Sequence, residues 1–183
     1  MTEKEKSHAE LLYQPADPEL AAERDETVRK LHEYNSMNPL DREARQAAIR
    51  KILGKAGSNC VVEQPFFCTY GYNITVGDDF FLNVNGKLMD SGKITIGNHV
   101  FIAPNVCIIT EEHAMDVEQR IAGLEYTHPV TIGDNVWICA GALILPGVTI
   151  GEGSVIGAGS VVTKDIPPRC LAVGNPCRVI RTL

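Results

Sequence analysis

The amino-acid sequence predicts a mainly β protein, built as a coil of short parallel strands and preceded by a helical hairpin. Large aliphatic residues recur at every sixth position over 132–162, and Gly, Asn and Asp separate them. The segment 1–57 differs, being rich in Ala, Glu, Arg and Lys with apolar residues at helical intervals. We therefore expect a helical segment over 1–57 and a coiled β domain over 58–183.

Size and net charge limit the classes of protein to which this chain can belong. The chain has 183 residues and is 44% hydrophobic, which suits one well-buried domain. Its net charge of −6 argues against a basic face for nucleic acid or a membrane surface. No apolar run approaches the roughly 18 residues of a membrane span, and the amino terminus is charged, unlike a signal peptide. We therefore expect a cytoplasmic protein with neither nucleic-acid nor membrane partners.

The pattern of cysteines is also consistent with the cytoplasm. None of the six is paired as CxxC, and without a signal peptide a reducing environment is expected. We interpret them as reduced thiols, most of them buried as small hydrophobic residues: Cys60, Cys68, Cys107, Cys139, Cys170 and Cys177.

The first helix of the hairpin is predicted over about 18–36. Asp17 followed by Pro18 is typical of an N-cap with Pro at the first helical position. The apolar residues after it fall near one helical face: Leu20, Val28, Leu31 and Tyr34.

A second helix is predicted after the break at Asn38-Pro39. Asp41 can cap it, its apolar positions are spaced i, i+4 from Ala44 through Ala48 to Ile52, and Gly54 is expected to stop it.

The repeat in the second part of the chain has a period of six. It runs without interruption through Ile132, Ile138, Ile144, Ile150, Ile156 and Val162. The fifth position of each unit is small or β-branched: Val136, Ala142, Val148, Ser154 and Ser160. Such a period fits neither a helix nor an alternating strand. It suits a coil whose short edges bury one large and one small residue and stack by parallel hydrogen bonds.

Earlier units fall in two registers. One comprises Val76, Leu82, Leu88 and Ile94, and the other begins two positions later with Ile96, Ile102 and Ile108. We therefore expect a local irregularity near residues 88–95.

A long excursion interrupts the repeat at about 109–129, and it is rich in charged residues and histidine. Loops of this length inside a compact repeat are uncommon and often functional. This segment is therefore where we expect an active site.

The repeat units resemble a known family. Ile132-Gly-Asp-Asn-Val-Trp and Ile150-Gly-Glu-Gly-Ser-Val resemble the hexapeptide repeat of left-handed parallel β-helix acyltransferases. The left hand is implied by this resemblance, because general chirality rules favour a right-handed crossover. More narrowly, the chain resembles the maltose and galactoside O-acetyltransferase group through Tyr70-Gly71-Tyr72-Asn73-Ile74, Ile102-Ala103-Pro104-Asn105-Val106 and Gly174-Asn175-Pro176-Cys177-Arg178.

The resemblance implies acetyl transfer from acetyl-CoA to a sugar hydroxyl of the maltose, glucose or galactoside type. It identifies His113 as the general base, since acyl transfer to a hydroxyl needs a group that removes its proton. The alternative for a lone loop histidine is a solvated side chain. Relatives usually have Pro after this histidine, whereas this chain has Ala114.

The resemblance also identifies Asn83 as the residue that stabilises the tetrahedral intermediate, because a carboxamide donates to an oxyanion without titrating. The alternative is a structural Asn at a coil corner, a role for which Asn85 competes.

Five positions are implied to bind the acceptor besides Asn83: Asp17, Arg24, Thr69, Ser91 and Trp137. Ser91 stands where galactoside relatives have Asp, which leaves the sugar specificity open. Asp17 is equally well explained as a helix cap, and Trp137 as the largest residue of a coil edge.

The donor site is implied near the carboxyl end. Basic and hydroxyl side chains suit the CoA phosphates, namely Thr163, Lys164, Arg178 and Arg181. Small residues at Ala140 and Ala158 leave backbone groups open to the pantetheine arm, and an amide near Ala140 would share the oxyanion. The alternative is a solvated cluster of terminal charges. The reaction needs no acetyl-enzyme, so Cys139 is not expected to act as a nucleophile.

Other interpretations remain open at this point. The same fold could acetylate serine, an amino sugar or an antibiotic, or it could be a non-catalytic scaffold. No metal is expected, because the five histidines show no paired spacing of the kind found at zinc sites. The resemblance further implies a homotrimer with active sites between subunits.

Overall fold

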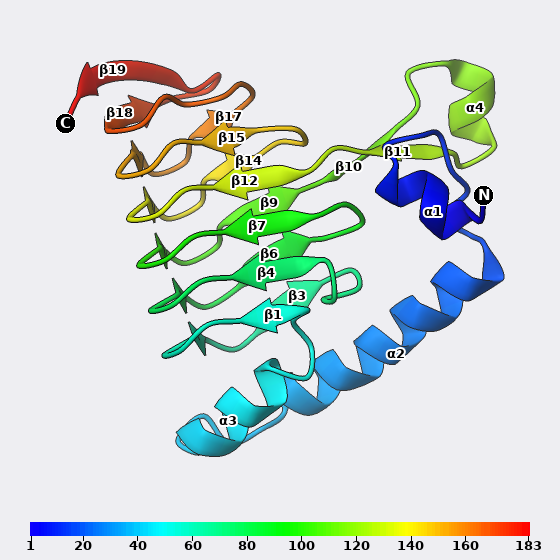
Figure 1. The fold of residues 1–183 in the computed structure, drawn as a ribbon, viewed down its shortest axis with the longest axis horizontal. Coiled ribbons are helices and arrows are strands. Elements are labelled where there is room, and N and C mark those ends of the chain that lie inside the picture. The colour runs from blue at the N-terminus through cyan, green and yellow to red at the C-terminus, as the bar shows by residue number, and fades with distance from the viewer.

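The computed structural model describes residues 1–183 and confirms a parallel β-helix preceded by helices (Figure 1). The helices are α1 (Glu3–His8), α2 (Pro18–Asn35) and α3 (Arg42–Ile49). The short α1 was not predicted as a separate element. None of the helices combines the length and the hydrophobicity that a membrane span requires.

The strands stack on three faces of the coil. Face 1 consists of β1 (Lys55–Ala56), β4 (Ile74–Val76), β7 (Ile94–Ile96), β12 (Val130–Ile132) and β15 (Thr149–Ile150). Face 2 consists of β2 (Val61–Val62), β5 (Phe81–Leu82), β8 (Phe101–Ile102), β13 (Trp137–Ile138), β16 (Val155–Ile156), β18 (Cys170–Val173) and β19 (Arg178–Thr182). Face 3 consists of β3 (Phe66–Cys68), β6 (Gly86–Met89), β9 (Cys107–Ile109), β14 (Leu143–Ile144) and β17 (Val161–Val162).

The six-residue period places one aliphatic column on the inside of each face. Ile132, Ile138 and Ile144 lie one on each face, and all three are buried together with the fifth-position residues that follow the same rule. Parallel pairing places similar side chains above one another on successive coils, as in the pair Ile132 and Ile150. The predicted core of the repeat is therefore confirmed.

The corners explain why Gly, Asn and Asp punctuate the repeat. Asn85, Asn105, Gly141 and Gly159 all have positive φ at the corner between faces 2 and 3. These are the residues that tolerate a left-handed backbone at least cost. The turn position at this corner thus belongs to Asn85, and not to Asn83.

The predicted irregularity near 88–95 is confirmed, and it belongs to the corner between faces 3 and 1. Thr75 pairs with Thr95 in the next coil, whereas Thr131 pairs with Thr149, so the earlier coil is longer. The extra length of the early coils lies between β3 and β4 and between β6 and β7. The excursion after β9 leaves from the same corner, which we call the wide corner.

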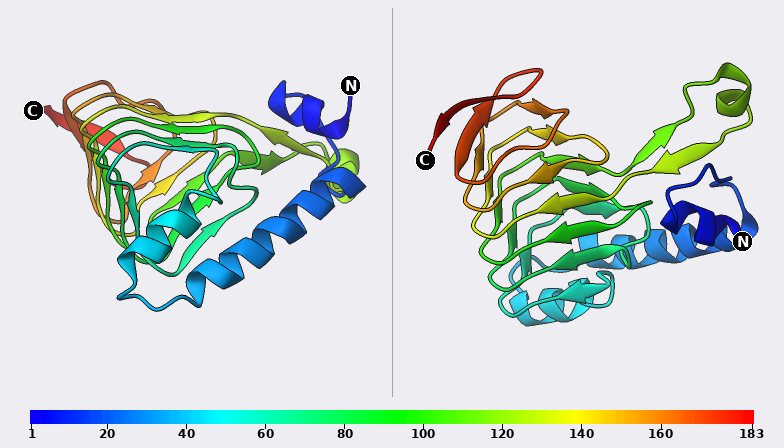
Figure 2. Two further views of the ribbon diagram at one scale, coloured as in Figure 1. Left: turned by 60° about the horizontal axis from the view of Figure 1, so that its bottom comes forward. Right: turned by 45° about the horizontal axis from the view of Figure 1, so that its top comes forward.

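The helical segment begins beside the wide corner, and α2 and α3 extend from there along the first coil (Figure 2). Asp17 caps α2 by accepting from the Glu19 N–H at 3.0 Å, as predicted. Leu20, Leu31 and Tyr34 are buried, but the expectation for Val28 was wrong: its side chain is 62% exposed, and the buried position is taken by Thr27. Thr27 turns inward because its hydroxyl donates to the Tyr70 carbonyl at 2.9 Å.

The end of the second helix also differs from expectation. Asp41 caps α3 as predicted, but the helix ends at Ile49, well before Gly54. Gly54 allows the backbone to pass close to Tyr72, because a Cβ there would lie 2.0 Å from the Tyr72 carbonyl oxygen. The glycine is needed for contact with the wide corner, and it does not cap the helix.

Candidate functional site

The excursion is an ordered hairpin and not a plain loop. Strands β10 (Glu111–His113) and β11 (Glu125–Thr127) pair antiparallel, and α4 (Val117–Ile121) lies between them. Asp116 caps α4 by accepting from the Gln119 N–H at 3.0 Å. The hairpin projects from the coil beside α1 and α2 (Figure 2).

Strand alternation sorts the charged residues of the hairpin. Glu111 and His113 lie two apart on β10, and His113 pairs with Glu125 across the hairpin, so these three side chains share one face. Glu112 and His128 contact each other on the other side, with Nε2 3.5 Å from Oε1. His128 is thereby placed away from His113, and it also contacts Glu10.

His113 is exposed but has a fixed neighbour. Its Nε2 lies 3.7 Å from Glu125 Oε1, and the Glu125 side chain is only 16% exposed. The other carboxylate oxygen of Glu125 accepts a hydrogen bond from the Tyr13 hydroxyl at 2.9 Å. Burial raises the pKa of Tyr13, which keeps that hydroxyl a donor. The arrangement is an imidazole beside a carboxylate that a third group holds in place.

A cavity of about 350 Å³ lies next to this carboxylate at the wide corner. It is lined by the amino-terminal segment, α2, the corner residues and the hairpin: Pro15, Ala16, Arg24, Thr69, Tyr70, Met89, Ser91, Glu111 and Glu125. We call it the acceptor cavity. Three of the predicted acceptor residues, Arg24, Thr69 and Ser91, are thus brought together. The Thr69 hydroxyl is buried there without a hydrogen-bond partner.

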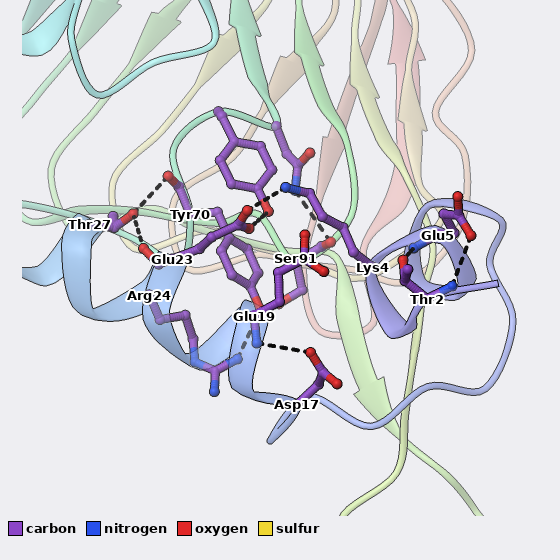
Figure 3. A network of polar contacts seen from close by, with 12 residues as sticks. Thr2, Lys4, Glu5, Asp17, Glu19, Glu23, Arg24, Thr27, Tyr70 and Ser91 are labelled. Atoms are coloured by element: carbon purple, nitrogen blue, oxygen red, sulfur yellow. Dashed lines mark hydrogen bonds and ion pairs between the residues drawn. The ribbon is translucent and has the colours of Figure 1, made fainter.

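Arg24 is held at the cavity by two neutral acceptors. Its Nη1 donates to the Pro15 carbonyl at 2.7 Å and to the Tyr70 hydroxyl at 2.9 Å. Asp17 lies at the start of α2 with its carboxylate turned to the Glu19 N–H (Figure 3). Asp17 does not line the acceptor cavity, so only the helix-cap role is visible in this chain.

The amino-terminal helix is bound to the same corner. Lys4 pairs with Glu23 at 2.5 Å, and its ammonium lies 4.6 Å from the centre of the Tyr72 ring (Figure 3). Tyr72 donates to Glu23 at 2.6 Å, and its ring packs on Tyr70. These contacts join α1 and α2 to the wide corner next to the acceptor cavity.

A buried carboxylate shapes the corner from inside. Asp90 is fully buried and accepts hydrogen bonds from the backbone N–H groups of Thr69, Tyr70 and Asn73 at 2.9, 2.8 and 3.2 Å. Burial raises the pKa of Asp90 to about 6, although these N–H groups act in the opposite direction. Asp90 thereby fixes the backbone that carries Thr69 into the cavity.

Asn83 lies elsewhere, at the corner between faces 2 and 3. It shares a shallow cavity of about 410 Å³ with Phe81, Phe101, Ile102, Ala103 and Trp137. Its Oδ1 accepts from the Val84 N–H at 2.8 Å, and its Nδ2 donates to no protein group. The side chain is therefore anchored by its oxygen and presents an open N–H donor.

The predicted donor residues lie farther up the coil. Ala140 and Ala158 are exposed, and their backbone N–H groups donate to no protein acceptor. They lie on successive coils at the same corner as Asn83. Thr163, Lys164, Arg178 and Arg181 are all exposed at the carboxyl-terminal end of the coil, and none of the three cations makes an ion pair with the protein.

One chain does not bring the two predicted catalytic residues together. His113 follows β9 at the wide corner, whereas Asn83 follows β5 at the corner between faces 2 and 3. In Figures 1 and 2 the hairpin and face 2 lie on opposite sides of the coil. Each corner therefore carries only part of the predicted constellation.

Sequence reasoning missed Glu125 and Tyr13 as neighbours of His113. Only the register of the hairpin reveals Glu125, because it places this residue of β11 opposite His113. Tyr13 reaches the site because the Tyr13 N–H donates to the Glu125 carbonyl at 3.0 Å, a contact between distant parts of the chain that no local pattern reveals.

Comparison with known proteins identifies the family. A family model described as the maltose acetyltransferase hexapeptide capping motif matches residues 6–57, and the bacterial transferase hexapeptide model matches residues 129–164. The galactoside O-acetyltransferase of Escherichia coli is 42% identical over 84% of this chain and 75% of its own. The chain belongs to the hexapeptide-repeat acetyltransferases.

Solved structures agree with this membership. A maltose O-acetyltransferase from Clostridium difficile superposes with a TM-score of 0.98 at 48% identity, covering 100% of this chain and 98% of the other. A galactoside acetyltransferase in complex with coenzyme A has a TM-score of 0.96 at 42% identity, with coverage of 100% and 91%. The predicted resemblance to the maltose and galactoside O-acetyltransferase group is confirmed.

Proposed function

We propose that this protein transfers the acetyl group of acetyl-CoA to a hydroxyl of a sugar. The observation that carries the proposal is the pair of half-sites on a hexapeptide-repeat acetyltransferase fold. One half is an imidazole and carboxylate beside a polar cavity, and the other is a free carboxamide N–H on a corner with open backbone amides. The first half suits a hydroxyl that must lose a proton, and the second suits an oxyanion.

His113 is the general base in this proposal. The acceptor oxygen attacks the carbonyl carbon of the thioester while its proton passes to the imidazole. The Glu125 carboxylate orients the ring and stabilises the imidazolium as it forms, and the Tyr13 hydroxyl holds Glu125. The carbon–sulfur bond then breaks, and the proton passes from His113 to the leaving thiolate of CoA.

Asn83 and the amide of Ala140 stabilise the tetrahedral intermediate. The Asn83 N–H is available because its Oδ1 is already bound to the Val84 N–H. A donor that is fixed before the reaction needs no reorganisation when charge develops on the oxygen. Burial raises the pKa of Cys139, so this nearby thiol stays protonated and direct transfer is the simpler route.

The donor site extends along the coil corner. The free N–H groups of Ala140 and Ala158 lie one coil apart, about 4.8 Å in a parallel sheet, and suit the amide oxygens of the pantetheine arm. Lys164, Arg178 and Arg181 supply positive charge for the phosphates, and Thr163 a hydroxyl. Two relatives support acetyl-CoA as the donor, since their structures contain coenzyme A or acetyl-CoA.

The complete site requires a second copy of the chain. Because His113 and Asn83 lie on different corners, we propose a homotrimer in which each cleft takes His113 from one subunit and Asn83 from its neighbour. Phe81, Phe101 and Trp137 form an outward apolar ladder on face 2, with Phe101 54% and Trp137 52% exposed. This ladder supports a partner or substrate at that face. The six free thiols support a reducing compartment, which we propose to be the cytoplasm.

A turnover screen tests the function. Purified protein is mixed with acetyl-CoA and, in turn, maltose, glucose, a galactoside, serine and an antibiotic alcohol, and release of free CoA thiol is followed. We expect turnover with at least one of the sugars and little with serine. Turnover with only serine or only the antibiotic alcohol would contradict a sugar acceptor. No turnover with any of these acceptors would favour a non-catalytic scaffold.

A further inference from the structure

A separate cavity lies at the first coil, at the end of the molecule that α3 covers (Figure 1). Its volume is about 230 Å³, and it is lined by the end of α2, by α3 and by β2 with its flanking residues: Tyr34, Arg42, Arg45, Gln46, Ile49, Cys60, Val61, Val62 and Glu63. It shares no lining residue with the acceptor cavity or with the cavity beside Asn83. The proposed chemistry therefore does not use it.

Arg45 brings a buried charge to this cavity, and its side chain is only 9% exposed. Its Nη1 donates to the Pro39 carbonyl at 2.9 Å, and its Nη2 donates to the Val62 carbonyl at 2.9 Å and to Glu63 Oε2 at 2.6 Å. The Nε–H is buried as well, and it has no acceptor in the protein. A buried donor on a charged group costs free energy unless something accepts from it, so this N–H favours a ligand that carries an acceptor.

The charges around the cavity favour an anion. Arg42 and Arg45 line it together with one carboxylate, that of Glu63. Glu63 pairs with Arg45, so the Arg42 charge is left without a carboxylate partner. An anionic ligand would give the site equal numbers of positive and negative charges, whereas a cation would add to an excess of positive charge.

The rest of the lining favours an apolar body on that anion. Five lining residues are hydrophobic: Tyr34, Ile49, Cys60, Val61 and Val62. The Tyr34 hydroxyl already donates to the Val62 carbonyl, and burial raises the pKa of the Cys60 thiol to about 11, so this wall is uncharged. A cavity of about 150 Å³ accommodates benzene. The volume of about 230 Å³ therefore has room for one ring and a carboxylate group.

We propose that this cavity binds a small monocarboxylate whose apolar part is about the size of a benzene ring. One carboxylate oxygen accepts from the Arg45 Nε–H, and Arg42 balances the negative charge. The ring packs on Ile49 and Val61. This site would bind its ligand whether or not the protein acetylates sugars.

A methyl NMR titration of the whole chain with benzoate tests this site, and benzyl alcohol is the uncharged comparison. We expect saturable shifts at the methyl groups of Ile49 and Val61, with a Kd of about 1 mM or lower. Benzyl alcohol keeps the ring but lacks the charge, so it should bind about tenfold more weakly, the effect of one charge-assisted hydrogen bond. No saturable shift at these methyl groups, or equal affinity for the two compounds, overturns the proposal.

Val61→Phe fills the cavity from its outer wall, and Val155→Phe is the matched control. Both valines belong to the outward column of face 2, where Val61 pairs with Phe81 and Val155 with Trp137, but only Val61 lines the cavity. Both side chains are partly exposed, so the core keeps its packing. We expect Val61→Phe to weaken benzoate binding by about tenfold or more, and the control to keep the wild-type Kd. Equal Kd values in the two variants would place benzoate elsewhere.

Arg42→Ala tests the charge, with Lys51→Ala as its control. Both residues are exposed cations, and only Arg42 lines the cavity. Arg42→Ala should weaken binding of benzoate by about two- to fivefold, as for an exposed charge, and leave that of benzyl alcohol unchanged. Lys51→Ala should affect neither. The same loss in both variants would show non-specific attraction to the protein's positive charges and contradict a defined carboxylate site.

Discussion

At the scale of single residues, Tyr13, Glu125 and His113 form the central contact series: Tyr13 donates a hydrogen bond to Glu125, and Glu125 lies beside the His113 imidazole. The Tyr13 hydroxyl fixes one oxygen of Glu125, and the other oxygen faces the imidazole. His113 is 58% exposed in the single chain, so this carboxylate is its main orienting contact. In the proposed mechanism, catalysis depends on His113 as the base and, to a smaller degree, on Glu125, which positions it.

Replacing His113 by Ala is expected to lower kcat by roughly 10²–10⁴-fold, as measured for a positioned general base. Asn83, the donor amides and the basic end of the coil are untouched, so KM for acetyl-CoA should stay near its wild-type value. Thiol release with a saturating sugar measures both. Turnover at the wild-type rate would remove His113 from the mechanism.

Replacing Glu125 by Gln is expected to lower kcat by about tenfold and to leave KM for acetyl-CoA unchanged. The amide keeps the shape of the side chain and can still accept from Tyr13, but it no longer stabilises an imidazolium. Restoring the charge with Glu125→Asp should recover only part of the rate, because the shorter side chain lies farther from His113. Equal loss in the Gln and Asp variants would indicate a role in packing.

The sequence suggested His113 and Asn83 as catalytic candidates because both lie in motifs that resemble those of the family. It missed Glu125 and Tyr13 because their roles depend on an antiparallel register and on a contact between the amino-terminal segment and the hairpin. It offered two roles for Asp17, and the structure shows the local one, because an N-cap needs only its own helix.

At the scale of elements, the wide corner positions the site. The early coils are longer there than the later ones, and the excursion leaves from the same corner. Asp90 binds three backbone N–H groups of that corner and so determines where Thr69 and Tyr70 lie. The buried Asp90 carboxylate therefore maintains the shape of the acceptor cavity.

Asp90 predicts a specific pH dependence of stability. Its pKa is raised from 3.8 to about 6 on folding, so between these values the folded state binds a proton that the unfolded state does not. The stability that this protonation contributes is therefore complete below the unfolded pKa and is lost as the pH rises through the folded pKa.

Urea unfolding of the wild type and Asp90→Asn at several pH values checks this sign. The advantage of the wild type over the variant should shrink between the two pKa values, by about 1–3 kcal/mol, and stay level above them. An advantage that grows with pH across this window would contradict the raised pKa.

The carboxyl-terminal end of the coil makes a second prediction at this scale. The double variant Lys164→Ala with Arg181→Ala should raise KM for acetyl-CoA by about tenfold or more with a smaller effect on the acceptor, because phosphate contacts are lost and proton transfer is not. Arg29→Ala with Lys30→Ala removes the same charge from α2, where both side chains pair with Glu26, and is the matched control. Equal KM values in the two double variants would place the CoA phosphates elsewhere.

Elements with local signals were predicted well, and those held by distant contacts were not. Local sequence predicts the helix caps at Asp17 and Asp41 and the six-residue repeat. A cap depends on the residues of one helical turn, and the repeat is visible within each coil. The predictions for Val28 and Gly54 failed because the surroundings of these positions are set by Tyr70 and Tyr72, which are distant in the chain. The hairpin with α4 was expected only as an excursion.

At the scale of the whole molecule, one chain separates the halves of the site. The coil places residues on corners at fixed intervals of sequence, so His113 and Asn83 cannot approach each other without changing the fold. Closed threefold symmetry would solve this for every subunit at once, since the same surfaces are paired three times. The apolar ladder of Phe81, Phe101 and Trp137 would then face the shared cleft.

The most direct test mixes two inactive variants. His113→Ala and Asn83→Ala proteins are each assayed alone, then combined after mild dissociation and reassociation, and acetyl-CoA turnover with a sugar is measured. Clefts that receive His113 from one chain and Asn83 from another are intact, so the account predicts that the mixture regains a substantial part of wild-type activity. A mixture of trimers that remains inactive, or a protein that light scattering shows to be a 20.0 kDa monomer with full activity, would contradict it.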